Sequence, residues 1–159
     1  MALGSDLVPP GLMAMALVCA VLPDIDALGL WLGIPYAHPF GHRGFTHALS
    51  FSVAMAGAGY LLAPEVGAQP SIAFLVLLMS AASHGLLDAL TNGGLGIAFF
   101  SPFSQRRYFL PWRVIEVSPL SLFALLSRHG LGVLRSELRY VWAPCLVFGL
   151  LGFALRIWI

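Results

Sequence analysis

Four apolar stretches organise the chain, and they cover residues 7–22, 46–63, 71–90 and 140–159. A membrane-spanning helix needs about 20 predominantly apolar residues, with a usable range of roughly 17–25. The last three stretches therefore predict membrane helices. The first is shorter, and Pro9 and Pro10 near its beginning suit the start of a helix. We expect this first segment to enter part of the bilayer or to lie tilted beside longer neighbours.

A further apolar region precedes the last stretch and is too short to span a membrane. Residues 118–126, taken with Leu131, Val133, Leu134 and Leu138, predict an interfacial or re-entrant helix. The pattern as a whole predicts an all-α polytopic membrane bundle of about four membrane helices plus this additional helix. We expect one membrane-embedded helical domain over residues 1–159, with a motif-bearing core at about residues 20–113.

The composition agrees with a bilayer environment. The chain is 59% hydrophobic and 9% charged, whereas a soluble domain has roughly 25% charged residues. So few charges cannot cover a water-facing surface, and membrane lipid is the expected partner. The net charge of +1 gives no reason to expect nucleic acid. Cys19 and Cys145 lie alone inside apolar runs, and we interpret both as packing residues.

The arginines predict an orientation in the membrane. The turn between the second and third stretches, residues 64–70, contains no arginine and carries Glu65. Seven of the eight basic residues lie on the other side, and they are Arg43, Arg106, Arg107, Arg113, Arg128, Arg135 and Arg139. Because basic residues favour the cytoplasmic side of a membrane, this face is predicted to be cytoplasmic in a multi-pass protein.

Histidine and aspartate side chains gather at the same face. They come from the end of the first segment, the entry to the second helix and the end of the third, and they are Asp24, Asp26, His42, His47, His84 and Asp88. The chain enters the second helix and leaves the third on one side, so these six groups are expected to converge. Ionisable groups at membrane depth are costly and mark functional sites.

The spacings of these residues suit metal coordination. His84 and Asp88 are four positions apart, which places them on one face of a helix. Asp24 and Asp26 follow Pro23, which biases the chain against helix, so both carboxylates can point one way. Imidazole and carboxylate ligands suit zinc, and also manganese or iron. Six candidates exceed one tetrahedral site, so two or more ions are plausible.

Neighbouring polar residues receive simpler interpretations. Thr46 is predicted to cap the second helix. Ser80 and Thr91 lie close to the stripe of His84 and are candidates for hydrogen bonds that orient the ligands. His38 and His129, which lie apart from the motifs, are interpreted as structural residues.

Four segments resemble a known family. They read Leu-Pro-Asp-Ile-Asp (22–26), Gly-His-Arg-Gly-Phe-Thr-His-Ala-Leu (41–49), Ser-His-Gly-Leu-Leu-Asp-Ala-Leu-Thr (83–91) and Pro-Phe-Ser-Gln-Arg-Arg-Tyr (102–108). In this order they resemble the membrane-bound metal-dependent hydrolases, a bacterial and archaeal group that includes LexA-regulated, DNA-damage-inducible inner-membrane proteins. That family is distantly similar to zinc-dependent phospholipase C and P1 nuclease, an all-helical, multinuclear zinc fold that cleaves phosphoesters. The resemblance implies an inner-membrane location, and it implies that the six histidines and aspartates are metal ligands or their immediate partners.

The chain departs from this family at one point. Family members usually carry a histidine a few residues from the N-terminus, and this chain has none before His38. One ligand is therefore missing, replaced by Asp6, or supplied by His38.

The predicted function is metal-assisted hydrolysis of a phosphoester. A bound metal lowers the pKa of a water from 15.7 toward roughly 7 and polarises the phosphoryl oxygen. Asp24 or Asp26, whichever is not a tight ligand, would accept the proton. Arg43, Arg106 and Arg107 would bind phosphate oxygens as planar donors; alternatively, they anchor the topology and contact lipid headgroups. A centre at headgroup depth suggests a lipid or lipid-linked phosphate as substrate.

Other classes of protein are weaker alternatives. A non-enzymatic metal-binding or sensory membrane protein would keep the same ligands without an open coordination position. A metal transporter should offer polar groups through the bilayer, but residues 51–62 and 147–155 contain no acidic or histidine side chain. An intramembrane metalloprotease is disfavoured because the chain contains no His-Glu-x-x-His motif.

Overall fold

The computed structural model describes residues 7–118 and 126–158, and this part of the chain is helical with no named strand. The elements are α1 (Pro10–Val21), η1 (Leu22–Asp26), α2 (Ala27–Trp31), η2 (Phe45–His47), α3 (Leu49–Leu62), η3 (Ala63–Val66), α4 (Pro70–Ala89), α6 (Arg128–Glu137), η4 (Leu138–Trp142) and α7 (Ala143–Trp158). Four helical runs are long and apolar enough to cross a membrane: Pro10–Trp31, Leu49–Val66, Pro70–Ala89 and Arg128–Leu155. The predicted all-α membrane bundle is therefore confirmed.

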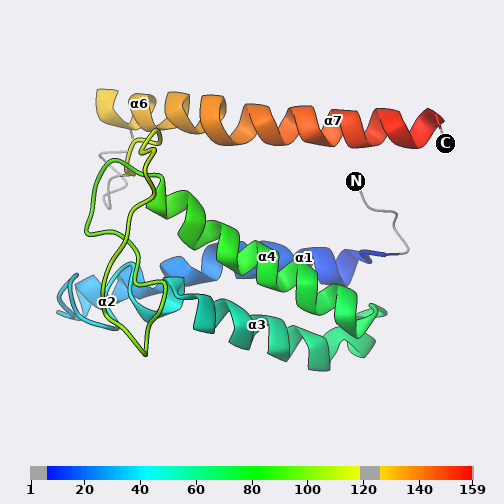
Figure 1. The fold of residues 1–159 in the computed structure, drawn as a ribbon, viewed down its shortest axis with the longest axis horizontal. Helices are drawn as coiled ribbons and strands as arrows, with labels where there is room; N and C mark the ends of the chain where they lie inside the picture. Colours follow the sequence, from blue (N-terminus) through cyan, green and yellow to red (C-terminus); the bar gives the residue numbers. More distant parts are fainter. Residues whose placement is uncertain (1–6, 119–125, 159) are drawn as a thin grey trace.

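Helices α1, α3 and α4 form the packed part of the molecule. Helix α4 contacts both α3 and α1 (Figure 1), and small residues let the backbones approach. A Cβ on Gly59 would lie 2.0 Å from the Cδ1 atom of Leu77, so a larger residue at this position would require the Leu77 side chain to shift. The core consists of Leu12, Ala16, Cys19, Ala63, Ala68, Ala73, Leu77 and Ala81. The buried Cys19 is thus a packing residue, as predicted, whereas Cys145 is exposed.

The first membrane segment is longer than the sequence predicts. Helix α1 ends at Val21, but the 3₁₀ helix η1 and then α2 continue it to Trp31 without a break. Pro23 lies in the first turn of η1, where a missing N–H removes no helical hydrogen bond. The expectation that the two aspartates follow the helix in non-helical backbone is wrong, because Asp24 and Asp26 lie inside this 22-residue run.

The second and third helices match their predictions closely. Helix α3 begins at Leu49 rather than Thr46, since the short 3₁₀ helix η2 precedes it. The predicted capping role of Thr46 is wrong, because no side chain caps α3. Helix α4, over Pro70–Ala89, follows the predicted third stretch to within one residue at each end.

The last helix stands apart from the other three. Helices α6 and α7 are joined by the π-helix η4 into one rod that runs beside the bundle (Figure 1). The segment predicted to be interfacial or re-entrant is therefore helical over Arg128–Glu137, but it continues directly into the fourth span. Most of the preceding apolar run, 119–125, lies outside the described residues. The most apolar stretch of this rod contains no buried residue.

The polar end of the molecule lies opposite the turn between α3 and α4. The loops over residues 32–48 and 90–118 gather at the end of the bundle that also holds α2 (Figure 1). The segments carrying the predicted metal ligands meet at this end. The fold thus brings the three motif-bearing regions together, as the sequence predicts.

Candidate metal centre

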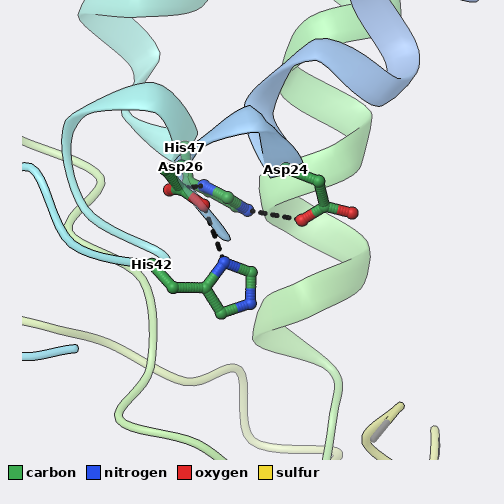
Figure 2. Close-up of side chains that lie close together, drawn as sticks. All are labelled: Asp24, Asp26, His42 and His47. Carbon is green, nitrogen blue, oxygen red and sulfur yellow. Dashed lines mark hydrogen bonds and ion pairs between the residues drawn. The ribbon is translucent and has the colours of Figure 1, made fainter. Parts of the chain in front are cut away.

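His47 lies at the centre of the histidine and aspartate cluster. It belongs to η2, between the aspartates of η1 and the polar end of α4, and its side chain is 0% exposed. Its ring lies between the carboxylates of Asp24 and Asp26 (Figure 2). The two nitrogens of the ring therefore face two different sets of partners.

A close backbone contact places α4 against His47. A Cβ added to Gly85 would lie 2.8 Å from the carbonyl oxygen of His47, so this position of α4 requires glycine. The neighbouring residue, His84, consequently lies beside His47 with ring centroids 4.9 Å apart. One turn before His84 on α4, the hydroxyl of Ser80 donates to the carbonyl of Ala16 at 2.6 Å and ties α1 to α4.

The carboxylate of Asp26 is fully engaged by protein donors. Its Oδ1 accepts from His42 Nδ1 at 2.7 Å. Its Oδ2 accepts from the backbone N–H of Arg43 at 3.1 Å, from the Thr46 hydroxyl at 2.5 Å and from His47 Nδ1 at 3.1 Å. We call these five residues the closed network. Since a carboxylate has about four acceptor sites, these four donors compete with a metal ion for the oxygens of Asp26.

Four other atoms form an arrangement that we call the open ring. They are Asp24 Oδ1, His47 Nε2, His84 Nε2 and Asp88 Oδ2, and they lie within 4.8 Å of one another. His47 Nε2 is 3.5 Å from Asp24 Oδ1 and 3.2 Å from Asp88 Oδ2. His84 Nε2 is 3.3 Å from Asp24 Oδ1 and 3.9 Å from Asp88 Oδ2. In a tetrahedral zinc site with bonds of about 2.0–2.2 Å, ligand atoms lie about 3.3–3.6 Å apart, so the ring has the right size.

The open ring is also short of hydrogen bonds. His47 Nε2, His84 Nε2 and Asp88 Oδ2 are buried and have no hydrogen-bond partner among the described residues. Buried polar atoms are rarely left without partners, and here three such atoms converge on one point. The chemistry of the donors, two imidazoles and two carboxylates, fits a divalent metal ion.

The second nitrogen of each histidine fixes its orientation. His84 Nδ1 donates to the carbonyl of Ala20 at 2.7 Å, and His47 Nδ1 donates to Asp26. Each ring therefore presents an unprotonated Nε2 to the open ring when the imidazole is neutral. Carbonyl and carboxylate partners of this kind typically orient histidine ligands in metal sites.

The surroundings of His47 also favour a positive charge in this position. Burial lowers the pKa of His47, but the carboxylates of Asp24, Asp26 and Asp88 outweigh it and raise the pKa to about 10. Without a metal ion, a proton on Nε2 would occupy the same place and pair His47 with Asp24 and Asp88. Since a metal ligand must be deprotonated, binding of a metal here releases a proton.

His42 and His47 belong to a second possible grouping with Asp24 and Asp26, whose ligand atoms also lie within 4.8 Å of one another. This grouping suits a metal less well, because the oxygens of Asp26 are already engaged. The other ring nitrogen of His42 points away from Asp26 (Figure 2). All six predicted ligands thus come together, but they divide into four ligand candidates and two orienting residues.

Arg43 is a buried clamp on Asp88. Its residue is 3% exposed, and its backbone has a φ of 64°, which is rare outside glycine. Nη2 donates to Asp88 Oδ1 at 3.0 Å, while Nη1 donates to Thr91 Oγ1 and the Gly93 carbonyl, each at 2.9 Å. One oxygen of Asp88 is thereby held in place, and the other is left facing the open ring.

The other predicted phosphate-binding arginines lie elsewhere. The guanidinium of Arg107 donates to the backbone carbonyls of Tyr36, His38, His42, Arg43 and Gly96. It therefore staples the loop that carries His42. Arg106 is exposed, and its guanidinium lies 5.4 Å from the ring centroid of Tyr108. The structure brings neither guanidinium into the open ring.

Of the two candidates for a replacement ligand, His38 does not join the cluster. Asp6 lies outside the described residues. His38 is exposed, accepts a hydrogen bond from the Phe40 N–H at its Nδ1, and belongs to neither metal grouping. His129 is likewise exposed, and its Nε2 donates to the Val117 carbonyl at 3.2 Å.

A pocket of about 790 Å³ borders the open ring. Asp24, His84 and Asp88 lie on its wall, and the side chain of Asp24 is 55% exposed. Glu116, Glu137 and Trp142 also line the pocket, and the sequence does not single them out. Glu137 and Trp142 lie in the rod formed by the last helix, and no motif in the sequence points to them.

Comparisons with known proteins identify the family. The family described as YdjM inner membrane protein matches residues 1–158. Inner membrane protein YbcI of Escherichia coli strain K12 is 39% identical over 160 residues, which cover 97% of this chain and 90% of that protein. Inner membrane protein YdjM of the same strain is 39% identical over 87 residues, or 50% of this chain and 44% of that protein. No solved structure matches.

These relatives are named for their location in the inner membrane, and their names mention no catalytic activity. They agree with the four apolar helical runs of this chain. The expected inner-membrane family is therefore confirmed at the level of family and location. From the match over nearly its whole length, the chain belongs to the YdjM family of inner membrane proteins.

Proposed function

We propose that the chain is a membrane-embedded, metal-dependent hydrolase that cleaves a phosphoester of a lipid or lipid-linked phosphate. The observation that carries this proposal is the open ring, in which three buried atoms without hydrogen-bond partners converge with Asp24 Oδ1. Zinc suits this ligand set, and manganese or iron also accept imidazole and carboxylate ligands. We propose that the centre lies at the cytoplasmic boundary, because the arginine-rich loops lie at the same end of the helical bundle.

The pocket favours catalysis over simple storage of a metal. A structural metal site is closed, whereas a catalytic site keeps a position open for water or substrate. Asp24, His84 and Asp88 border a pocket of about 790 Å³, which is large enough for a headgroup. A metal bound there would polarise a phosphoryl oxygen and lower the pKa of an attacking water.

The second carboxylate oxygen of Asp24, which is not one of the four atoms of the open ring, is the proposed proton acceptor. Oδ1 of Asp24 faces the histidines, but the side chain is 55% exposed, and the second carboxylate oxygen points away from His47 (Figure 2). Asp26 is unsuited to this role because four donors already engage its oxygens. Of the two aspartates that the sequence offers as catalytic residues, Asp24 therefore remains the candidate.

The residue proposed to bind the phosphate also differs from the one that the sequence predicts. Arg43 is already bound to Asp88, so its guanidinium acts through that carboxylate and positions it. His42 borders the pocket and has one ring nitrogen that Asp26 does not hold. His42 is therefore the better candidate for a direct hydrogen bond to the phosphate.

The test compares metal content and turnover in the same preparations. The detergent-solubilised chain is purified, its metal is measured by elemental analysis, and cleavage of phosphodiesters and phospholipids is assayed. We expect bound metal and turnover in the wild type, loss of both after His84→Ala, and neither change after His129→Ala. Full metal content with no turnover on any phosphoester would reject the hydrolase and leave a metal-binding or sensory protein. Undiminished metal in His84→Ala would reject the site.

A further inference from the structure

The pocket beside the open ring has two chemically different sides. The loops outside the membrane-spanning runs supply the polar residues Tyr36, His42 and Thr91, together with the apolar Ile115 and Val117. The other side comes from within those runs. Besides the metal-ligand candidates and Glu137, that side consists of Val21, Ala27, Leu87, Val141 and Trp142. An occupant that fills both sides must be amphiphilic.

The apolar side is open to the membrane. Val21 is 66% exposed, Leu87 is 37% exposed and Trp142 is 57% exposed. Val21 belongs to the first membrane run, Leu87 to the third and Trp142 to the fourth, and lipid is the solvent of such segments. Exposed apolar side chains from three candidate membrane runs therefore lie at the rim of the pocket.

The arrangement of the last helix creates this opening. Helix α7 continues directly from η4 and makes no extensive contact with α1, α3 or α4 within the described residues. The rod of α6, η4 and α7 runs beside α1 and α4 at a distance from them (Figure 1). The π-helix η4, which supplies Val141 and Trp142 to the pocket, is a type of distortion that occurs frequently at functional sites.

We propose that Val21, Leu87, Val141 and Trp142 form an acyl groove that takes one hydrocarbon chain of a membrane lipid entering sideways from the bilayer. The chain would lie between the first and last membrane runs, with the phosphate at the open ring. A lipid chain reaches this groove without leaving hydrocarbon, and its headgroup then meets the polar wall. The identity of the reacting phosphoester rests on the proposed function, but the groove itself does not.

The binding test uses the fluorescence of Trp142. Trp31→Phe, Trp112→Phe and Trp158→Phe leave Trp142 as the one tryptophan of the chain. A phospholipid with brominated acyl chains, which quench tryptophan on contact, is titrated into the protein in detergent micelles. We expect saturable quenching, whereas brominated detergent-like additives without a phosphate should quench weakly and without saturation.

Two matched variants locate the binding site. Val21→Phe narrows the groove, and its side chain is exposed, so the larger ring does not disturb the core. Val18→Phe makes the same change on the same helix, at a residue that is 56% exposed and does not line the pocket. We expect Val21→Phe to weaken lipid binding by about tenfold or more, and Val18→Phe to leave it unchanged. Quenching that never saturates, or equal responses of the two variants, would overturn the groove.

An activity measurement separates this inference from the proposed function. Val21→Phe should raise KM for a long-chain phospholipid more than it raises KM for a water-soluble phosphodiester. Saturable quenching with no cleavage of either ester would reject the hydrolase and retain the groove. Cleavage of the soluble ester with unsaturable quenching would reject the groove and retain the hydrolase.

Discussion

The two nitrogens of the His47 ring face two regions. In one region the polar atoms have hydrogen-bond partners, and in the other several buried polar atoms have none among the described residues. On the Nδ1 side, the closed network surrounds Asp26 with four donors, and each of its oxygens is engaged. On the Nε2 side, the open ring collects three buried atoms without hydrogen-bond partners among the described residues. Both regions are built from histidine and aspartate, so residue type alone does not distinguish them.

The difference separates a supporting role from a binding role. A matched buried carboxylate rigidifies its neighbours, whereas unmatched polar atoms that converge are costly unless a ligand completes them. His47 connects the two regions, because Asp26 orients the ring whose other nitrogen faces the open ring. The closed network thus holds the geometry that the open ring presents to a metal.

The largest effect is expected from His47→Ala, which removes the residue that the two regions share. Metal affinity should fall by more than the roughly 10–100-fold that loss of an orienting residue costs. The protein should also lose stability, because Asp26 then lacks one of its buried donors. Elemental analysis and thermal unfolding in detergent measure the two effects. His129→Ala, at an exposed histidine, is the control, and metal content equal to the wild type in His47→Ala would contradict the shared role.

Asp24→Asn should mainly reduce metal binding, whereas Asp26→Asn should reduce both stability and metal binding. Asp24→Asn replaces an exposed anionic ligand candidate with a neutral amide, so metal binding should be lost with little change in stability. Asp26→Asn puts an amide NH₂ group where donors converge, which should cost about 1–3 kcal/mol of unfolding free energy and weaken metal binding roughly 10–100-fold. Unfolding curves and metal titrations on both variants provide the check. The same pattern in both variants would show that the two regions are not distinct.

The sequence predicts the presence of the membrane helices better than it predicts where each helix begins and ends. Long apolar stretches predict membrane helices because the bilayer requires about 20 residues, and this rule located α3 and α4. The sequence predicts too short a first segment, because Pro23 indicates its end. Proline is, however, tolerated in the first turn of η1. The continuity of α6 with α7 was missed because the polar residues of α6 interrupt the apolar pattern.

The sequence predicts which residues meet at the site, but it does not predict which of them are free to bind a metal and which only orient the others. Topology alone brings six histidines and aspartates together, because the chain enters α3 and leaves α4 at the same end. Nothing in the order of residues shows that four donors engage Asp26 while Asp24 stays exposed. These properties depend on side-chain directions in η1 and on long-range partners such as Thr46. The sequence also does not show that Arg43 and Arg107 bind acceptors within the protein, since an arginine suits phosphate oxygens and protein oxygens equally well.

Arg43→Lys tests how the open ring is held from outside. The guanidinium reaches Asp88, Thr91 and the Gly93 carbonyl together, and a single ammonium cannot reproduce this fork. We expect metal affinity to fall by roughly tenfold, at the lower end of the range for orienting residues. Arg106→Lys is the matched control, because that guanidinium lies outside both regions. Equal metal affinities in the two variants would show that Arg43 does not position Asp88.

The smallest effect on metal affinity is expected from Thr46, which contributes a single hydroxyl donor to the closed network. Thr46→Val keeps the shape of the side chain but removes the bond of 2.5 Å to Asp26 Oδ2. A hydrogen bond to a charged group contributes about 1.5–3 kcal/mol, so the unfolding free energy should fall within that range. Metal affinity should fall only a few-fold, because His42, His47 and the Arg43 N–H still hold the carboxylate.

Thr46→Ser separates the hydroxyl from the methyl group in this effect. Serine keeps the donor, so the unfolding free energy should stay near that of the wild type when both variants are measured by denaturant titration in the same detergent. If Thr46→Ser destabilises as much as Thr46→Val, packing rather than hydrogen bonding explains the loss. If Thr46→Val instead abolishes metal binding, Asp26 is not held by several independent donors, and the closed network depends on this one bond.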